Sequence, residues 1–320
     1  SSLPHVIFIL ADDMGYNDIG YAGDDFAALT PNLDALAAGG VRLGRYYTQQ
    51  LCTPARAALL TGRYPFRTGM QCEVVQPTEP WGLPTEYALL PEHLQQLGYA
   101  THAIGKWHLG HAMADYLPQR RGFDTFYGYL TDHTDYDTHQ NPEYGVLDFL
   151  HAVADGNGDG QCVDDQGGNY SVVLHTDRAI QILDAHRSGA GSSLDQPLFL
   201  YLAYAAPHYP LEYDAGIDYS PGANKLIYRP TSTTRTKHEQ IGRLLDALDA
   251  RGFLENYLLV FASDNGGCPG FGTSNYPLRG TKHYLWEGGT RARAFVAGSA
   301  LSPSPASNAA YGGVFHVTDW

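Results

Sequence analysis

Two apolar runs, residues 6–10 and 257–261, read as buried strands, and each is closely followed by oxygen-bearing side chains. The four side chains are Asp12, Asp13, Asp264 and Asn265. In open α/β sheets, ligands bind beyond the carboxyl ends of the strands. Three carboxylates gathered there would repel one another without a cation, and oxygen ligands suit Ca²⁺ or Mg²⁺. Either pair alone would more often be ordinary turn residues, but two pairs after buried strands favour a metal site.

A second chemical candidate is Cys52, at the start of the segment CTPARAALLTGR. Pro54 suits a first helical turn and Gly62 suits a helix end, so Cys52 is expected at a helix N-terminus, which favours an anion. Most lone cysteines are simply small buried side chains, and the residues alone leave that reading open. The chain has 4 cysteines without CxxC spacing, which argues against a zinc site. If Cys52 is used chemically, an odd number remains, which argues against a full disulfide framework.

The acidic composition narrows the partners that the protein can have. The 320 residues carry 34 Asp and Glu against 20 Lys and Arg, a formal net charge of −14. This charge argues against nonspecific binding to nucleic acid or anionic membranes, and an anionic substrate would need a local basic pocket or a metal. No apolar run approaches the ~18–20 residues that span a bilayer, and no signal peptide is visible.

The elements that must position these residues alternate along the chain. Short apolar runs and helical patterns follow one another, which predicts an α/β fold with a largely parallel sheet. The expected strands are 6–10, 99–104, 198–202 and 257–261, and the expected helices are 31–39, 91–97, 171–186 and 241–251. The segments expected to be irregular are 155–168, 188–196, 218–237 and 302–313.

The segment around Cys52 resembles the signature of the sulfatase family, Cys-x-Pro-x-Arg followed by Leu-Leu-Thr-Gly-Arg. The resemblance covers nearly all of the chain and is closest to the arylsulfatase B-like enzymes (N-acetylgalactosamine-4-sulfatase). Further family motifs occur in the family's order at 105–110, 121–124, 207–208, 264–267 and 278–282. The likeness to the arylsulfatase B-like group rests on residues 46–49, 120–125 and 285–289.

The resemblance implies an alkaline-phosphatase-like α/β sandwich, with a large mixed, mostly parallel sheet flanked by helices. Residues 1–320 would be the catalytic N-terminal domain, incomplete at its C-terminus, because the family's smaller C-terminal domain should begin where the chain stops. We therefore expect apolar surface to be exposed near residues 314–317. Relatives also have a longer helix before residue 241, and the polar stretch 229–237 is expected to replace part of it.

The resemblance also implies a modification and a cofactor. In the family the cysteine is oxidised to formylglycine, so a formylglycine-generating enzyme would be a partner of this chain. The hydrated aldehyde at Cys52 would then attack sulfur. One Ca²⁺ per chain would be held by residue 52 together with Asp12, Asp13, Asp264 and Asn265.

The family's basic residues carry over to five positions. Arg56 and Lys106 would bind and orient the formylglycine, and His108 would contact it. His208 and Lys282 would bind the sulfate, and one of them would protonate the leaving oxygen. Together they would form the basic pocket that an acidic protein needs for an anionic substrate.

The implied function is hydrolysis of sulfate esters on a sulfated sugar, such as a 4-sulfated N-acetylgalactosamine unit, or on an aryl ester. A lysosomal or extracellular location follows from the same resemblance. Two alternatives stay open: a phosphate or phosphonate ester hydrolase on the same fold, and a noncatalytic homologue that binds sulfated glycans. Residues 155–160 resemble half of an EF-hand loop, but Gln166 stands where Glu is expected, so a surface loop is favoured over a second Ca²⁺ site.

Overall fold

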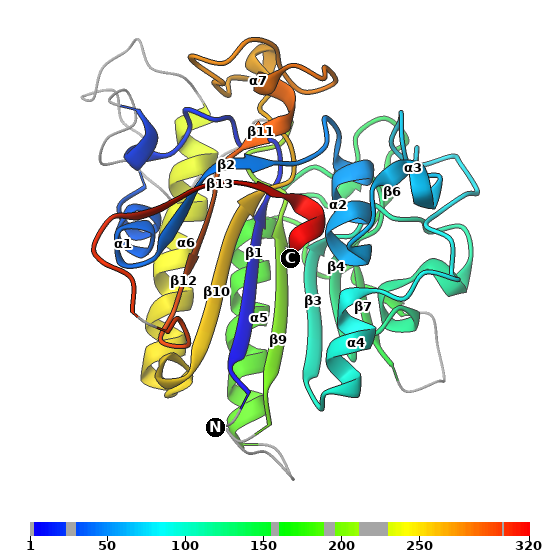
Figure 1. Cartoon of the computed structure of the whole chain (residues 1–320). Coiled ribbons are helices and arrows are strands. Elements are labelled where there is room, and N and C mark those ends of the chain that lie inside the picture. The colour runs from blue at the N-terminus through cyan, green and yellow to red at the C-terminus, as the bar shows by residue number, and fades with distance from the viewer. Residues whose placement is uncertain (1–2, 24–29, 155–159, 189–195, 211–229, 303) are drawn as a thin grey trace.

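The computed structural model describes residues 3–23, 30–154, 160–188, 196–210, 230–302 and 304–320, with the backbone alone between 230 and 238. Among these residues, eleven strands form one mixed sheet with helices on both faces (Figure 1). The strands of this sheet are β1 (His5–Ala11), β2 (Val41–Tyr47), β3 (Ala100–Lys106), β4 (Thr125–Tyr129), β7 (Leu150–Val153), β8 (Gln161–Cys162), β9 (Leu198–Tyr204), β10 (Tyr257–Ser263), β11 (Arg291–Ala292), β12 (Ala294–Ala297) and β13 (Ala309–His316). Two short strands, β5 (Gln140–Asn141) and β6 (Val146–Leu147), pair separately.

The order across the sheet is β11-β2-β12-β10-β1-β9-β3-β4-β7-β8, and β13 pairs with β2. Every pair from β10 through β1, β9 and β3 to β4 is parallel. The pairs of β12 with β10 and of β7 with β4 are antiparallel, so antiparallel pairs flank the parallel centre on both sides. This is the mixed sheet that the sequence predicts, and its parallel centre brings the carboxyl ends of β1, β9 and β10 to one edge.

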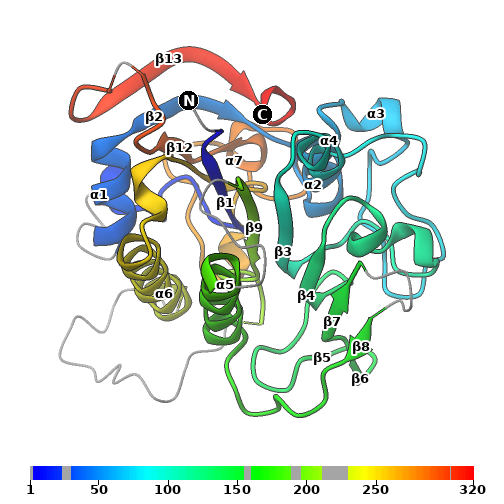
Figure 2. The same cartoon turned by 90° about the horizontal axis from the view of Figure 1, so that it is seen from below.

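The helices form two layers because the central strands bury both of their faces. Figure 2 shows α1 (Pro31–Gly39), α5 (Ser171–Ser188) and α6 (Pro230–Ala250) on one side of the sheet, with α2 (Cys52–Thr61) and α4 (Leu90–Gln96) on the other. The one-turn helices α3 (Pro65–Thr68) and α7 (Glu287–Thr290) complete the set among the described residues.

Alternation along β1 divides the core in two. Ile7 and Ile9 pack in the cluster that contains the apolar side chains of α1, α5 and α6. Phe8 and Leu10 pack in the cluster that contains the end of α2. Because successive side chains of a strand point to opposite faces, an unbroken apolar run is what a strand between two helical layers requires.

The expected central strands and helices are confirmed, but the short strand β8 lies within the segment expected to be irregular at 155–168 and pairs with β7. Two longer segments also differ from the expectation. The helix expected at 241–251 begins at Pro230 in the structure, so the polar stretch before it belongs to α6 instead of replacing helix. The segment expected to be irregular at 302–313 contains the start of β13, which pairs with β2. Neither segment has a periodic apolar pattern, and tertiary packing decides such cases.

Some expectations fall on residues outside the described part of the chain. These are the EF-hand-like residues 155–159, most of the loop expected at 188–196, and residues 218–229. The four cysteines are all described, and all are free thiols. No helix in the described ranges is long and apolar enough to cross a membrane.

Candidate active site

The candidate site begins where β1 and β10 end. These parallel strands are in register from His5 with Tyr257 to Ala11 with Ser263, so the acidic pairs that follow them leave the sheet at the same level. Asp12, Asp13, Asp264 and Asn265 are all buried. Asp13 has a φ of 62°, a conformation that costs a non-glycine residue free energy, and its N–H donates to Oδ1 of Asp264 at 3.1 Å.

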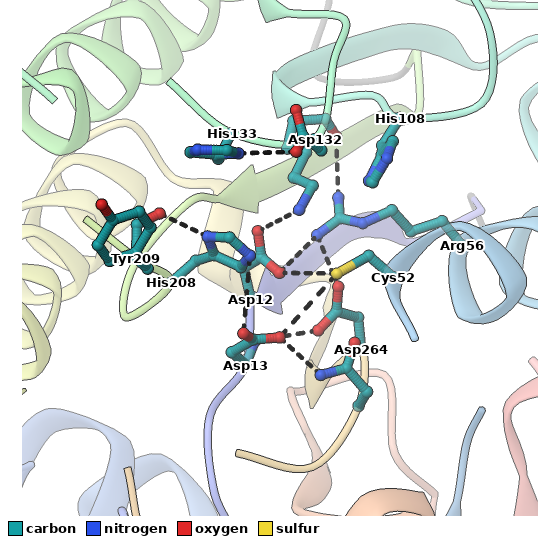
Figure 3. A network of polar contacts seen from close by, with 12 residues as sticks. Asp12, Asp13, Cys52, Arg56, His108, Asp132, His133, His208, Tyr209 and Asp264 are labelled. Carbon is teal, nitrogen blue, oxygen red and sulfur yellow. Dashed lines mark hydrogen bonds and ion pairs between the residues drawn. The ribbon is translucent and has the colours of Figure 1, made fainter. Parts of the chain in front are cut away.

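Cys52 is the first residue of α2 and is 1% exposed. Its Sγ lies 3.4 Å from Oδ1 of Asp12 and 4.0 Å from Oδ1 of Asp13 (Figure 3). Gly62 ends the helix in the left-handed conformation, as its position in the motif predicts. Burial raises the pKa of the Cys52 thiol strongly, although Lys106 and Lys282 oppose the change. The unmodified side chain is therefore a thiol and a poor nucleophile.

Three buried cations pair with the three carboxylates. Nζ of Lys106 lies 2.7 Å from Oδ2 of Asp12, and Nζ of Lys282 lies 2.9 Å from Oδ2 of Asp13. Nη2 of Arg56 lies 2.9 Å from an oxygen of the third carboxylate, which belongs to Asp264. Buried charges persist in proteins when they are paired and hydrogen-bonded in this way. The side chains therefore balance their own charge before any ligand enters.

The surroundings shift the pKa values of Asp12 and Asp264 in opposite directions. Burial alone would raise the pKa of Asp12, but Lys106 and the other nearby cations hold it well below its ordinary value. Burial and the neighbouring Asp12 carboxylate raise the pKa of Asp264 to about 6, against the effect of Arg56. The protein alone thus leaves one of its buried carboxylates incompletely stabilised as an anion.

The two histidines predicted for the site are buried or nearly so. Nδ1 of His208 lies 2.6 Å from the carbonyl oxygen of Tyr209, and its Nε2 lies 3.1 Å from Nζ of Lys282. Because a carbonyl only accepts, Nδ1 must carry the hydrogen, and Nε2 accepts from the lysine. Burial and Lys282 lower the pKa of His208 to about 4. His108 contacts the carbonyl oxygen of Val75 through Nε2, at 3.1 Å.

The structure thus gathers every residue that the sequence singles out, from six separate segments. They are Asp12, Asp13, Cys52, Arg56, Lys106, His108, His208, Asp264, Asn265 and Lys282. The group follows β1 and β10, lies on α2, and includes the end of β3 and the loops after β9 and before α7. Their roles in a reaction stay predictions.

The carboxylate and amide oxygens beside Cys52 fit a hard divalent cation. Asp12, Asp13, Cys52 and His208 offer ligand atoms that lie within 4.8 Å of one another. Oδ1 of Asn265 is buried and has no hydrogen-bond partner among the described residues, whereas its Nδ2 donates to Asp13 at 2.7 Å. A cation would satisfy that oxygen and stabilise the carboxylates in their ionised form.

Sequence reasoning missed a second acid–histidine pair beside this group. Asp132 and His133 follow β4, and Figure 3 shows them next to His208 and Tyr209. It also missed Tyr136, whose hydroxyl donates to the carbonyl oxygen of His208 at 2.9 Å. The strand that precedes the pair, β4, was not among the expected strands, so the sequence offered no clear signal for Asp132 and His133.

The mixed α/β sheet, with its ligand site beyond the parallel strands, has the alkaline-phosphatase-like fold. A protein of the alkaline phosphatase superfamily from Vibrio parahaemolyticus superposes with a TM-score of 0.58 at 16% identity, covering 100% of this chain and 64% of that one, which supports the fold alone. The model of the sulfatase family matches residues 4–319. The chain belongs to the sulfatase family.

Several relatives are similar over most of the chain. Mouse arylsulfatase J is 41% identical over 331 residues, which cover 100% of this chain and 52% of that protein. Human arylsulfatase A is 35% identical, over 90% of this chain and 57% of that protein. The crystal structure of Ps i-CgsB in complex with k-i-k-neocarrahexaose has a TM-score of 0.85 at 30% identity, covering 99% of this chain and 70% of that one. The chain therefore spans about half the length of the curated relatives it matches.

Proposed function

We propose that this chain hydrolyses sulfate esters. The observation that carries the proposal is the position of Cys52, which begins α2, is buried, and lies beside Asp12 and Asp13 within a ring of paired cations. A residue used only for packing would not need three buried ion pairs around it, because burying charge is costly. Membership of the sulfatase family supports the same reading.

The nucleophile in this proposal is formylglycine made from Cys52. The modified residue supplies a hydrated aldehyde, whose hydroxyl is the attacking group and whose second hydroxyl permits release of sulfate. The raised pKa of the Cys52 thiol supports the need for modification, because an unmodified thiol would stay protonated. A formylglycine-generating enzyme would be the partner that matures the chain.

A bound Ca²⁺ is the proposed cofactor, with Asp12, Asp13, Asp264, Asn265 and residue 52 as its ligands. The cation would supply positive charge that stabilises the sulfate and the attacking oxygen. Lys106 and Lys282 hold two of these carboxylates ionised and in place. The unpartnered Asn265 oxygen supports a cation at this position.

The proton for the leaving oxygen would come from the pair formed by His208 and Lys282. Their nitrogens lie 3.1 Å apart and share one hydrogen bond, in which the ammonium donates to Nε2. Burial alone would lower the pKa of Lys282, but the carboxylate of Asp13 raises it well above its ordinary value, so the proton rests on the lysine. Tyr136 holds the backbone of His208 and thereby fixes this geometry.

The proposed substrate is a sulfated sugar. One relative, the mouse N-acetylgalactosamine-6-sulfatase, is 32% identical over 90% of this chain, and the neocarrahexaose in the Ps i-CgsB complex is an oligosaccharide. A 4-sulfated N-acetylgalactosamine unit stays the specific prediction for the substrate, and a lysosomal or extracellular location stays the prediction for the protein. Chondroitin 4-sulfate, heparan sulfate and simple aryl sulfates should be compared, and failure on the first alone would contradict this choice.

The central experiment combines mass spectrometry with turnover. The chain is expressed with a formylglycine-generating enzyme, and the peptide that contains residue 52 should lose its sulfur. Cys52→Ala should abolish hydrolysis of 4-nitrophenyl sulfate while leaving the unfolding transition in place, whereas Cys162→Ala, at an exposed cysteine, should change neither. Faster hydrolysis of 4-nitrophenyl phosphate would favour a phosphatase, and binding of sulfated glycans without any turnover would favour a noncatalytic homologue.

A further inference from the structure

The pair formed by Asp132 and His133 has no part in the roles proposed above. Nδ1 of His133 lies 2.8 Å from Oδ2 of Asp132, and His133 is 8% exposed. Burial alone would raise the pKa of Asp132, but the hydrogen bond from His133 holds it below its ordinary value. Because an ionised carboxylate only accepts, Nδ1 carries a hydrogen and Nε2 is the ring nitrogen left for another group.

Hydrogen bonds with two buried side chains, Asp148 and Asn141, hold the loop that carries the pair. The carboxylate of Asp148 accepts hydrogen bonds from the N–H of Leu130 at 3.0 Å, from the N–H of Thr131 at 2.8 Å, and from the Thr131 hydroxyl at 2.6 Å. Nδ2 of Asn141 donates to Oδ1 of Asp132 and to the carbonyl oxygen of His133, both at 3.3 Å. Both supporting side chains, Asp148 and Asn141, are buried. A side chain held this firmly suits the orientation of a ligand.

The pair lies on the outer side of the candidate active site. The ring of His133 lies 5.8 Å from the ring of His208 and 5.9 Å from the ring of Tyr209. Tyr209 is 42% exposed and packs against Phe271, which is 44% exposed, with ring centres 4.7 Å apart. Figure 3 shows His133 and Tyr209 on the far side of His208 from Cys52 and Asp13. An ester that places its sulfur near Cys52 would therefore extend its alcohol portion towards His133.

We propose that His133, oriented by Asp132, binds the sugar portion of the sulfate ester, with Nε2 hydrogen-bonded to the hydroxyl next to the esterified oxygen and the sugar ring against Tyr209. This inference rests on the proposed function. A sugar hydroxyl can both donate and accept a hydrogen bond, so it suits Nε2 whether or not that nitrogen carries a hydrogen. Aryl sulfates have no such hydroxyl and would not use the contact.

A hydrogen bond from His133 to a sugar hydroxyl would affect sulfated sugars and leave aryl sulfates unaffected, so the test compares both kinds of substrate with one matured enzyme. The probes are 4-nitrophenyl sulfate, the best-hydrolysed member of a set of N-acetylgalactosamine and galactose monosulfates with the ester on a ring hydroxyl, and analogues of that sugar lacking each neighbouring hydroxyl in turn. The variants are His133→Ala and Asp132→Asn, with His93→Ala at an exposed histidine of α4 as the matched control.

We expect His133→Ala to lower kcat/KM on the sulfated sugar roughly tenfold, the effect of one lost hydrogen bond, and to change aryl sulfate hydrolysis less than about twofold. Removing the neighbouring hydroxyl from the sugar should lower the wild-type kcat/KM by a similar factor. It should not lower the kcat/KM of His133→Ala any further, because both changes remove the same contact. Asp132→Asn should give a smaller loss confined to the sugar, and His93→Ala should give none.

Three results would overturn the inference. Equal losses on the sugar and the aryl sulfate would show a structural role, and multiplicative losses from the variant and the deoxy analogue would show that His133 contacts another group. Hydrolysis of the aryl sulfate without hydrolysis of any sugar in the set would remove the sugar contact altogether. If the wild type hydrolyses neither class, the proposed function itself fails, and the two failures are distinguishable.

Discussion

Substitution of Lys106 by methionine tests whether the buried carboxylate of Asp12 needs the positive charge of Lys106 for the protein to remain stable. The side chain is buried, and its ammonium is 2.7 Å from Oδ2 of Asp12, which is also fully buried. Arg56 is the next nearest cation to this carboxylate, with its Nη2 3.7 Å from Oδ1. Lys106→Met keeps most of the apolar volume but leaves Asp12 without its closest partner. Removal of one partner from a buried pair costs about 3–5 kcal/mol, a large share of the roughly 5–15 kcal/mol by which domains are stable.

The assay is urea unfolding of wild type and variant, with a calcium chelator and then with saturating Ca²⁺. With chelator we expect the full loss of about 3–5 kcal/mol, and with Ca²⁺ a smaller one, because a cation at Asp12 would replace the missing charge. Arg243→Ala is the control, since Arg243 and Asp177 form an exposed ion pair at 2.6 Å, a kind of pair worth about 0–1 kcal/mol. A chelator result no larger than this control would refute the reasoning.

Three further predictions concern other parts of the molecule. Asp264→Ala should lower bound Ca²⁺ well below one per chain, measured by elemental analysis of purified protein, and full occupancy would show that this carboxylate is no ligand. Gly105→Ala should destabilise the fold by at least ~1–2 kcal/mol in urea unfolding, because Gly105 has a φ of 93° and a Cβ there would lie 1.9 Å from the carbonyl oxygen of Ala203; unchanged stability would contradict the close approach of β3 and β9. Burial lowers the pKa of His175 to about 3, so its unfolded form binds the extra proton and stability should fall as pH drops from about 6.5 towards 3. His175→Phe should flatten that fall in unfolding measured between pH 7 and pH 5, and an unaltered slope would assign the pH dependence to other groups.

The central strands could be predicted from the sequence because their signal is local. Residues 198–202 form an unbroken apolar run, and β9 is buried along its whole length. β2 mixes arginine, glycine and tyrosine within seven residues, and its place in the sheet depends on partners far along the chain, including β12 and β13. The beginning of α6 was missed for a related reason, since threonine-rich sequence has no helical pattern of its own.

Some residues of the candidate site could likewise be predicted from local sequence, and others could not. The metal-ligand candidates could be found from residue type and position, because Asp12 and Asp264 follow buried parallel strands. The basic residues could not be found in this way, since Lys282 meets Asp13 across 269 positions and no local pattern announces it. Only the family resemblance identified them. Asp132 and His133 had neither a resemblance nor a strong local pattern, and the fold alone revealed their position.

The burial of Cys52 determines when the residue can be converted during the synthesis of each molecule. Residues 51–60 are all buried, so no enzyme could close around this cysteine once the chain has folded. Conversion would have to occur on the nascent or unfolded polypeptide, before α2 docks on the sheet. A molecule that folds first would remain unconverted for as long as it stays folded. The active fraction of a preparation would then depend on how many chains were converted at Cys52 before they folded. Neither added maturation enzyme nor added calcium could raise that fraction afterwards.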